Sequence, residues 1–279
     1  MSNISTSEIT FIITTFKSEK FIYGCLDSLP LDSKKIVVEN SSNFKLKSSL
    51  ETKYQNLKCY IMKTNLGYGS ANNFAINKSS TRYIFIINPD AYLKSDTLSY
   101  MFKALENKQF AIAAPYSKDD FNESYFKNQK LIPQQSVKGF AMFIDKTQME
   151  DVGYFDENFF IYLEEIDLCK RALNRKKNIF LINAQIIHLS GISHGDRNDI
   201  EMEKSRNWHW MWSKFYYNKK HYGYLKGFLA TIPNFLNSFL KVCFYLIVFN
   251  KKKIVINLMR LRGLIYSYLL MKSSYRPYD

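Results

Sequence analysis

One short stretch of the sequence combines residue types that could hold a metal ion. The apolar run that begins at Tyr83 stops on Asn88, Pro89 and Asp90. Proline lacks the N–H that a sheet ladder needs and restricts the residue before it, so a strand here must end just before Asp90. A carboxylate at the end of a rigid strand is suited to binding a divalent cation. Asn-Pro-Asp is also a common turn sequence, and taken alone the turn is the simpler interpretation.

A cluster of acids opens a second stretch, where spacing predicts a helix over 163–175. Glu164, Glu165 and Asp167 crowd its first turn, and the helix dipole by itself favours negative charge there. At 100° per residue, Glu165 falls within the apolar arc, whereas Glu164 and Asp167 fall on the polar side with Arg171. We therefore expect Glu165 to be partly desolvated, which raises the pKa of a carboxyl group toward that of a general base.

A histidine closes a third apolar run in a similar way. His188 ends the run over 179–189, 23 positions after Glu165, so the intervening helix and strand could return it beside that acid. A satisfied histidine in the core is the alternative. His194 follows a glycine-containing turn and is less constrained.

A glycine-containing turn precedes another predicted helix in the segment "TNLGYGSANNFAI" (64–76). Gly67 and Gly69 indicate a tight turn, and Ser70 is a candidate cap for the helix. A helix N-terminus that opens at the ligand edge suits an anion. The segment is not a dinucleotide-binding fingerprint, because Asn72 stands where the third glycine would be. A purely structural turn is the alternative.

The elements that must position these residues are apolar runs separated by amphipathic helical patterns. Strands that are apolar throughout, with such helices between them, predict a mainly parallel sheet covered on both faces. Ligands of these sheets bind beyond the carboxyl ends of the strands, which is where Asp90 is expected. Residues 120–135 are polar and predict a loop. The predicted strands are 9–16, 34–39, 58–63, 82–88, 110–115, 137–145 and 179–189.

The charge of the 279-residue chain is divided unevenly. Residues 1–203 carry 25 basic and 24 acidic side chains, whereas residues 204–279 carry 14 basic and one acidic, out of a net charge of +14. At 46% hydrophobic and 23% charged residues the composition indicates a globular protein. The four scattered cysteines and the lack of a signal-peptide pattern at the start favour the cytoplasm.

The basic part alternates cations with apolar runs. Residues 200–222 predict a helix with two tryptophans on one face, and 228–249 is apolar but contains Pro233 and Lys241. A central lysine costs about 2.5–3.5 kcal/mol on membrane insertion. We therefore expect helices that lie on an anionic membrane surface, on its inner face. A helical bundle with a solvated basic face is the alternative. Nucleic-acid binding is disfavoured because the cations are interleaved with long apolar runs.

Several motifs, in this order, resemble family 2 glycosyltransferases of the GT-A fold, and most of all rhamnosyltransferase-like bacterial members, over about residues 8–225. The resemblance implies an α/β fold with a mainly parallel sheet flanked by helices. It implies a catalytic domain over 1–203, with a nucleotide-sugar half at about 1–115 and an acceptor half at about 116–203. Residues 204–279 form the helical extension. The motifs are "ITFIITTF", "IVVENSS", "NLGYGSANN", "INPDAYL", "KGFAMFI", "GYFDENFFIYLEEIDLCKRA" and "HLSGISHG".

The same resemblance implies an activity and a set of site residues. The activity is inverting, metal-dependent transfer of a sugar, rhamnose-like as a first expectation, from a dTDP- or UDP-sugar to a hydroxyl of a glycan or lipid-linked glycan in cell-surface polysaccharide synthesis. Asp90 and His188 would hold Mg²⁺ or Mn²⁺. Glu165 would be the acceptor base, beside Glu164 and Asp167. The residues implied to bind the nucleotide sugar are Thr14, Thr15, Glu39, Asn65, Gly67, Asn72, Asn88 and Asp90.

The sequence departs from the family pattern at three acids. Asn88 replaces the first aspartate of the DxD motif, and Glu39 and Glu165 are each one methylene longer than the usual aspartate. Two other functions stay open. A sugar-nucleotide nucleotidyltransferase is disfavoured because "TTFKSEKF" has no glycine after the first strand. A non-catalytic membrane scaffold of the same fold is the other.

Overall fold

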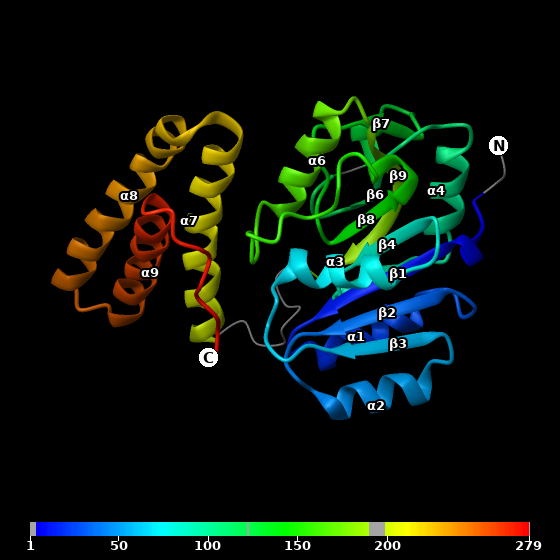
Figure 1. Cartoon of the computed structure of the whole chain (residues 1–279), viewed down its shortest axis with the longest axis horizontal. Helices are drawn as coiled ribbons and strands as arrows, with labels where there is room; N and C mark the ends of the chain where they lie inside the picture. Colours follow the sequence, from blue (N-terminus) through cyan, green and yellow to red (C-terminus); the bar gives the residue numbers. More distant parts are fainter. Residues whose placement is uncertain (1–3, 122, 190–198, 279) are drawn as a thin grey trace. The chain divides into compact units, whose positions relative to one another are not determined.

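The computed structural model describes residues 4–121, 123–189 and 199–278 (Figure 1). The chain divides into two compact units. The first, here called the sheet unit, consists of Met1–Phe155 and Glu165–Arg197, and the second, the helical unit, consists of Asp156–Glu164 and Asn198–Asp279. A short piece of chain just before Glu165 therefore belongs with the C-terminal helices. The domain boundary after residue 203 remains a prediction, and it falls inside helix α7 (Ile200–Tyr222).

The described residues of the sheet unit form a nine-stranded mixed sheet in the order β3-β2-β1-β4-β8-β6-β9-β5, with β7 on β9. β3, β2, β1 and β4 are mutually parallel, and β8 is antiparallel to both of its neighbours. The strands are β1 (Ile9–Thr15), β2 (Lys34–Glu39), β3 (Leu57–Ile61), β4 (Tyr83–Ile87), β5 (Ala91–Leu93), β6 (Ile112–Ser117), β7 (Leu131–Pro133), β8 (Ala141–Asp145) and β9 (Ile179–His188).

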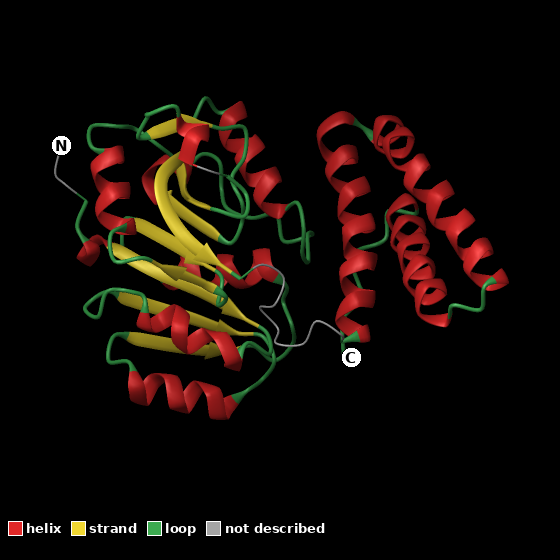
Figure 2. Ribbon diagram, turned by 180° about the vertical axis from the view of Figure 1, so that it is seen from behind, coloured by secondary structure: helices red, strands yellow, loops and turns green. Residues whose placement is uncertain are grey.

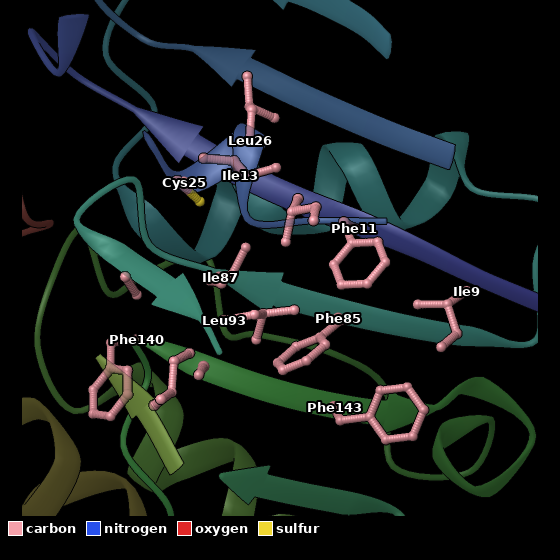
Figure 3. Packing of buried hydrophobic residues seen from close by; sticks show 14 of the residues in the cluster. Ile9, Phe11, Ile13, Cys25, Leu26, Phe85, Ile87, Leu93, Phe140 and Phe143 are labelled. Carbon is pink, nitrogen blue, oxygen red and sulfur yellow. The ribbon is translucent and has the colours of Figure 1, made fainter. Parts of the chain in front are cut away.

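Helices cover both faces of this sheet, which confirms the predicted fold class (Figure 2). Alternate residues of β1 point to opposite faces: Phe11 and Ile13 pack with α1, α2 and α4, whereas Ile12 packs with α3 and α6. Figure 3 shows the cluster to which Phe11 and Ile13 belong, with Phe85 among its labelled members. The ring centres of Phe11 and Phe85 are 5.5 Å apart. The helices are α1 (Glu19–Asp27), α2 (Phe44–Lys53), α3 (Tyr68–Lys78), α4 (Thr97–Leu105), α5 (Lys146–Met149) and α6 (Glu164–Asn174).

The prediction of a plain loop over 120–135 is wrong. This stretch contains a 3₁₀ helix, Glu123–Phe126, and β7, which pairs with β9. Phe126 is fully buried in the sheet-unit core. The sequence also gave no sign of β5, which pairs with the end of β9. Strands of three residues are too short to display the alternation from which a strand is predicted.

The helical unit confirms the predicted helical extension. α7, α8 (Tyr224–Ile247) and α9 (Lys251–Tyr268) pack through two apolar clusters. Gly263 of α9 lies against the backbone of Trp208 in α7, so the two helices approach closely. Among the described residues, α8 is the helix whose length and mean hydropathy, 1.2, would allow it to cross a membrane. The clusters comprise Trp208, Trp212 and Met259 in one, and Met211, Phe215 and Leu264 in the other.

Candidate active site

The carboxyl ends of the parallel strands meet at one edge of the sheet, and most of the predicted site residues lie there. β1, β2 and β4 are parallel to one another, and β6 and β9 run in the same direction because β8 lies antiparallel between β4 and β6. Thr14, Glu39, Asn88 and His188 therefore occupy the same edge. β8 runs the other way, so its first residues, just after Phe140, begin at this edge.

The short strand β5 brings Asp90 beside His188. Ala91 pairs with His188 in an antiparallel register, and the Leu189 N–H donates to the Asp90 carbonyl at 3.0 Å. The Asp90 side chain is fully buried, and its Oδ1 lies 3.7 Å from His188 Nε2. The two side chains that the sequence predicted as metal ligands are thus neighbours, although they lie far apart along the chain.

His188 is held as a neutral imidazole. Its ring stacks on Phe140 with 4.1 Å between centres and 15° between planes. Burial lowers the pKa of His188, and the nearby carboxylates of Asp90, Asp120 and Asp119 oppose this shift without reversing it. A neutral imidazole keeps a lone pair for coordination. The Asn88 N–H donates to the Phe140 carbonyl at 2.8 Å, which ties the end of β4 to the same segment.

The donor set at Asp90 and His188 fits a divalent cation. One carboxylate oxygen and one neutral imidazole nitrogen lie 3.7 Å apart, close enough to bind a single ion. In the part of the chain that the structure describes, no group of three His, Cys, Asp or Glu side chains gathers around a common point. Ions such as Mg²⁺ are commonly bound through one or two protein ligands, while substrate phosphates and water complete the coordination.

Glu165 lies against the residues that lead into β8. A Cβ built on Gly139 would lie 3.6 Å from both Cβ and Cγ of Glu165. Burial raises the pKa of Glu165, against the opposing effects of the backbone amides of Glu165 and Ile166 and of the Lys138 ammonium group. This agrees with the predicted partial desolvation. Because Phe140 follows Gly139 directly, Glu165 and His188 lie against adjacent residues of one segment.

The glycine-containing segment forms a network with β1. The Thr14 hydroxyl donates to Asn72 Oδ1 at 3.1 Å, and Asn72 Nδ2 donates to the Tyr68 carbonyl at 3.0 Å. Asn65 Oδ1 accepts from the Gly67 N–H at 2.9 Å. Gly67 has a φ of 81° and precedes the first residue of α3, so a left-handed glycine, and not the predicted Ser70, is the N-cap.

Glu39 holds the loop after β2. Its carboxylate accepts from the N–H and hydroxyl of Ser41 and, at 2.6 Å, from the N–H of Asn43. Thr15 donates its hydroxyl to the Val38 carbonyl at 3.4 Å. In this structure Glu39 and Thr15 therefore shape the edge of the sheet through contacts to backbone atoms. The predicted roles of these and the other site residues in binding a nucleotide sugar stay predictions.

The model of the family described as glycosyl transferase family 2 matches residues 10–169, which is more than half of the chain. The chain belongs to this family. It is similar to the low-salt glycan biosynthesis hexosyltransferase Agl10 of Haloferax volcanii, 24% identical over 64% of this chain and 66% of that protein. It is also similar to the rhamnosyltransferase WbbL of Escherichia coli K12, 26% identical over 72% of this chain and 89% of that protein. The match thus spans just under two thirds of the Haloferax protein.

The fold of this family 2 glycosyltransferase is also found among solved structures. The mannosyltransferase PcManGT of Pyrobaculum calidifontis, solved with GDP-Man and Mn²⁺, superposes with a TM-score of 0.59. The likeness covers 93% of this chain and 86% of that one at 13% sequence identity. An identity this low establishes the shared fold alone.

Two acids of the family 2 chain are more buried than the sequence predicted. Asp167 is fully buried and Glu164 is 4% exposed, although both were expected on the polar side of the helix. The predicted pair with Arg171 is present, with Asp167 Oδ2 2.8 Å from Arg171 Nε. Arg171 also donates to the Val152 carbonyl at 2.8 Å and to the Tyr154 carbonyl. The helical projection failed because the preceding loop covers this side of α6.

Sequence reasoning missed two residues that shape the site. Asn40 donates to the Gly67 carbonyl at 3.3 Å, which links the end of β2 to the N-terminus of α3. The Tyr68 hydroxyl donates to the Gly139 carbonyl, which fixes the segment that Glu165 contacts. Asn40 could have been found, because it is a polar residue directly after a buried strand. Tyr68 gave no signal, since its partner is remote in sequence. His194 and the end of the motif "HLSGISHG" lie outside the described residues.

Proposed function

We propose that this chain is an inverting, metal-dependent glycosyltransferase that moves a sugar from a nucleotide-diphosphate donor to a hydroxyl group. One observation supports this more than any other. The Asp90–His188 pair and Glu165 both lie at the segment Gly139–Phe140, His188 by stacking on Phe140 and Glu165 by packing on Gly139. A cation ligand set and a candidate base are thus close to one another at the ligand edge of the sheet.

Asp90 and His188 would hold Mg²⁺ or Mn²⁺. When bound, the ion supplies Lewis-acid stabilisation of the charge that develops on the departing diphosphate. The buried Asp90 carboxylate contributes one negative charge, and the neutral His188 ring contributes a nitrogen donor. Asn88 adds no second charge where the family motif has an aspartate. The Asn88–Phe140 hydrogen bond instead fixes the backbone that leads to Asp90.

Glu165 would accept the proton of the acceptor hydroxyl. A sugar hydroxyl becomes a good nucleophile when a carboxylate takes its proton in the transition state. Burial raises the pKa of Glu165, so its carboxylate is a stronger base than an exposed glutamate. One base and a single displacement invert the anomeric carbon, because the acceptor must approach from the face opposite the leaving diphosphate.

The names of two relatives support a proposal for the donor and the acceptor. The Escherichia coli relative is named a rhamnosyltransferase and the Haloferax relative a hexosyltransferase of glycan biosynthesis. We therefore propose a rhamnose-like sugar on dTDP or UDP as the donor, and a glycan or lipid-linked glycan of the cell surface as the acceptor. These relatives are 24% and 26% identical, so GDP-linked sugars belong in the test as well.

We further propose that α8 lies on the inner face of the cell membrane. Only 17% of its most apolar stretch of 18 residues is buried, so the helix exposes a large apolar surface. Cationic side chains accompany this surface in α8 and at the start of α9, and they complement anionic headgroups. The exposed apolar residues include Leu225, Leu229, Leu236, Phe239, Leu240, Phe244, Ile247 and Phe249, and the cations are Lys226, Lys241, Lys251, Lys252 and Lys253.

Thermal shift with a panel of nucleotide diphosphates tests the proposed function. UDP, dTDP and GDP are each added with and without Mn²⁺, and we expect one of them to raise Tm in the presence of the metal only. Asp90→Asn should abolish the metal-dependent part of the shift. Asp96→Asn is the control, since it changes the same charge at an exposed helix start. An equal shift in the Asp90 variant and the wild type would contradict the proposed ligand set.

A further inference from the structure

The segment that leads into Glu165 belongs to the helical unit. Asp156–Glu164 clusters with α7, α8 and α9, and α6 begins at Glu164. Residues 156–163 are here called the strap. Glu164 is the first residue of α6 and Glu165 is the second, so one residue separates Glu165 from the strap. The contacts of the strap therefore constrain the backbone conformation just before Glu165.

Hydrogen bonds from α7 hold the strap at both ends. Asp156 Oδ2 accepts from the Tyr216 hydroxyl at 2.9 Å and from Lys220 Nζ at 2.8 Å. The Ile161 carbonyl accepts from the Ser213 hydroxyl at 2.9 Å. Burial acts to raise the pKa of Asp156, but hydrogen bonds from Lys220 and Asn158 hold it below its ordinary value. Asp156 is thus ionised at neutral pH, and its contacts to α7 are charge-assisted.

Aromatic contacts fix the middle of the strap. The Phe159 ring packs edge-on against Tyr216 at 4.9 Å, and the Tyr162 ring packs edge-on against Trp210 at 5.5 Å. Phe160 stacks on His209 at 4.4 Å, and the Arg276 guanidinium lies 4.0 Å from the centre of the same ring. The four successive strap residues 159–162 therefore each have a partner on α7, and Phe160 has a further one on the C-terminal segment, here defined as residues 273–276.

His209 joins the C-terminal segment to this arrangement. Burial lowers the pKa of His209 to about 3, so the ring is neutral. Its Nε2–H donates to the Tyr275 carbonyl at 2.8 Å, and its Nδ1 accepts from the Ser273 hydroxyl at 3.0 Å. Arg276 donates to the carbonyls of Ser273 and Tyr275, which places its guanidinium over Phe160.

The end of the strap is strained. Tyr162 has a φ of 74° and Leu163 a φ of 68°, so two consecutive residues other than glycine adopt the left-handed conformation just before Glu164. Such residues persist only where the surrounding contacts over-determine the backbone, and they cluster at functional sites. Here the contacts that compensate for the strain come from α7 and from the C-terminal segment.

We propose that the helical unit positions the acceptor base. The strap orders the backbone up to Glu164, the residue before Glu165, and Tyr216, Ser213 and Arg276 are positioning residues that act on Glu165 through this stretch of chain. This inference rests on the proposed role of Glu165 as base. It gives the C-terminal helices a catalytic purpose in addition to any contact with a membrane.

Two matched pairs of conservative variants test this proposal in the full chain. Ser213→Ala removes the hydrogen bond to the strap, whereas Ser267→Ala removes an equivalent 2.9 Å bond within α9. Tyr216→Phe removes the hydroxyl bound to Asp156, whereas Tyr268→Phe removes a hydroxyl bound to Thr231 at 3.0 Å. Within each pair the two variants lose the same chemical group from the helical unit. The residue changed in the first variant contacts the strap, and the residue changed in the second does not.

We expect the double variant Ser213→Ala/Tyr216→Phe to exchange the amide hydrogens of residues 157–165 at least tenfold faster. Its kcat for sugar transfer should fall roughly tenfold or more, because small displacements of a reacting group are costly. The acid limb of its pH–rate profile should move toward that of an exposed glutamate. The Kd for the nucleotide with Mn²⁺ should stay within about twofold, since Asp90 and His188 lie in the sheet unit.

The double variant Ser267→Ala/Tyr268→Phe should change none of these four quantities. Equal effects in the two double variants would overturn the proposal, as would a slower reaction with unchanged exchange and pH profile in the strap variant. If the wild-type chain neither binds a nucleotide with Mn²⁺ nor transfers a sugar, the proposed function fails. The exchange comparison would still decide whether the strap orders the backbone at Glu165.

Discussion

The approach of α9 to α7 yields a graded stability prediction. A Cβ added at Gly263 would lie 2.3 Å from the Trp208 carbonyl oxygen, about 1 Å closer than an ordinary van der Waals contact. The obstacle is backbone, so relief requires the two helices to separate. Overpacking costs about 1–3 kcal/mol, and the better helix propensity of alanine returns up to about 1 kcal/mol. We expect Gly263→Ala to lower the free energy of unfolding of the helical unit by about 2 kcal/mol.

Two other glycines calibrate this value. At Gly227 the added Cβ would lie 2.9 Å from the Lys219 nitrogen, and at Gly139 its nearest neighbour, Glu165, is 3.6 Å away. Urea unfolding followed by far-UV circular dichroism, which reports on both units, should therefore rank the losses as Gly263→Ala, then Gly227→Ala, then Gly139→Ala, with the last near zero. Equal losses at Gly263 and Gly139 would refute the argument from close approach, as would a gain in stability at Gly263.

Three further outcomes are expected. Glu165→Gln should lower kcat for transfer by about 10²–10⁴-fold, the usual contribution of a general base, while calorimetry should give an unchanged Kd for the nucleotide with Mn²⁺; full activity would exclude Glu165 as the base. Because the folded-state pKa of Glu165 is raised, its ionisation destabilises the fold as pH rises through the unfolded value of 4.5, so Glu165→Gln should be more stable than wild type at pH 7 and lose this advantage near pH 4, as measured by urea unfolding. Phe244→Glu should reduce flotation with vesicles that contain phosphatidylserine relative to Phe74→Glu in the sheet unit, and equal binding by both variants would contradict a role for α8.

The longest buried elements could be predicted from sequence, because burial on both faces leaves a continuous apolar run. β2 was predicted with its observed bounds, and β4 ends one residue before Asn88, as proline chemistry requires. The position of Asp90 at the ligand edge was predicted for the same reason. Its contact with His188 was expected from the family resemblance and not from the strand pattern, since it depends on β5, whose three residues show no pattern of their own.

The surroundings of the acid cluster could not be predicted in the same way. A helical projection treats α6 as a cylinder with one buried face. Arg171, however, binds both Asp167 and the carbonyls of Val152 and Tyr154, so the loop before α6 covers Asp167 as well. The strap contacts join residues that lie about 50 positions or more apart in sequence, such as Ile161 with Ser213 and Tyr162 with Trp210. Periodicity within one helix carries no information about such partners. The contacts between α7 and the segment before Glu165 could therefore not be predicted from the sequence.

The two chemical halves of the proposed site are supported by different parts of the molecule. The pairing of β5 with β9 holds Asp90 against His188 inside the sheet unit, and it depends on backbone hydrogen bonds that a surface substitution does not disturb. Glu165 lies in the sheet unit as well, but the chain that leads to it is held by α7 and the C-terminal segment. Substitutions of the helical-unit residues that contact the strap should therefore separate donor binding from proton transfer. α8 packs on both α7 and α9. A membrane surface that binds α8 could therefore change how well the strap is ordered. Through the strap it would affect the position of Glu165 without contacting either substrate.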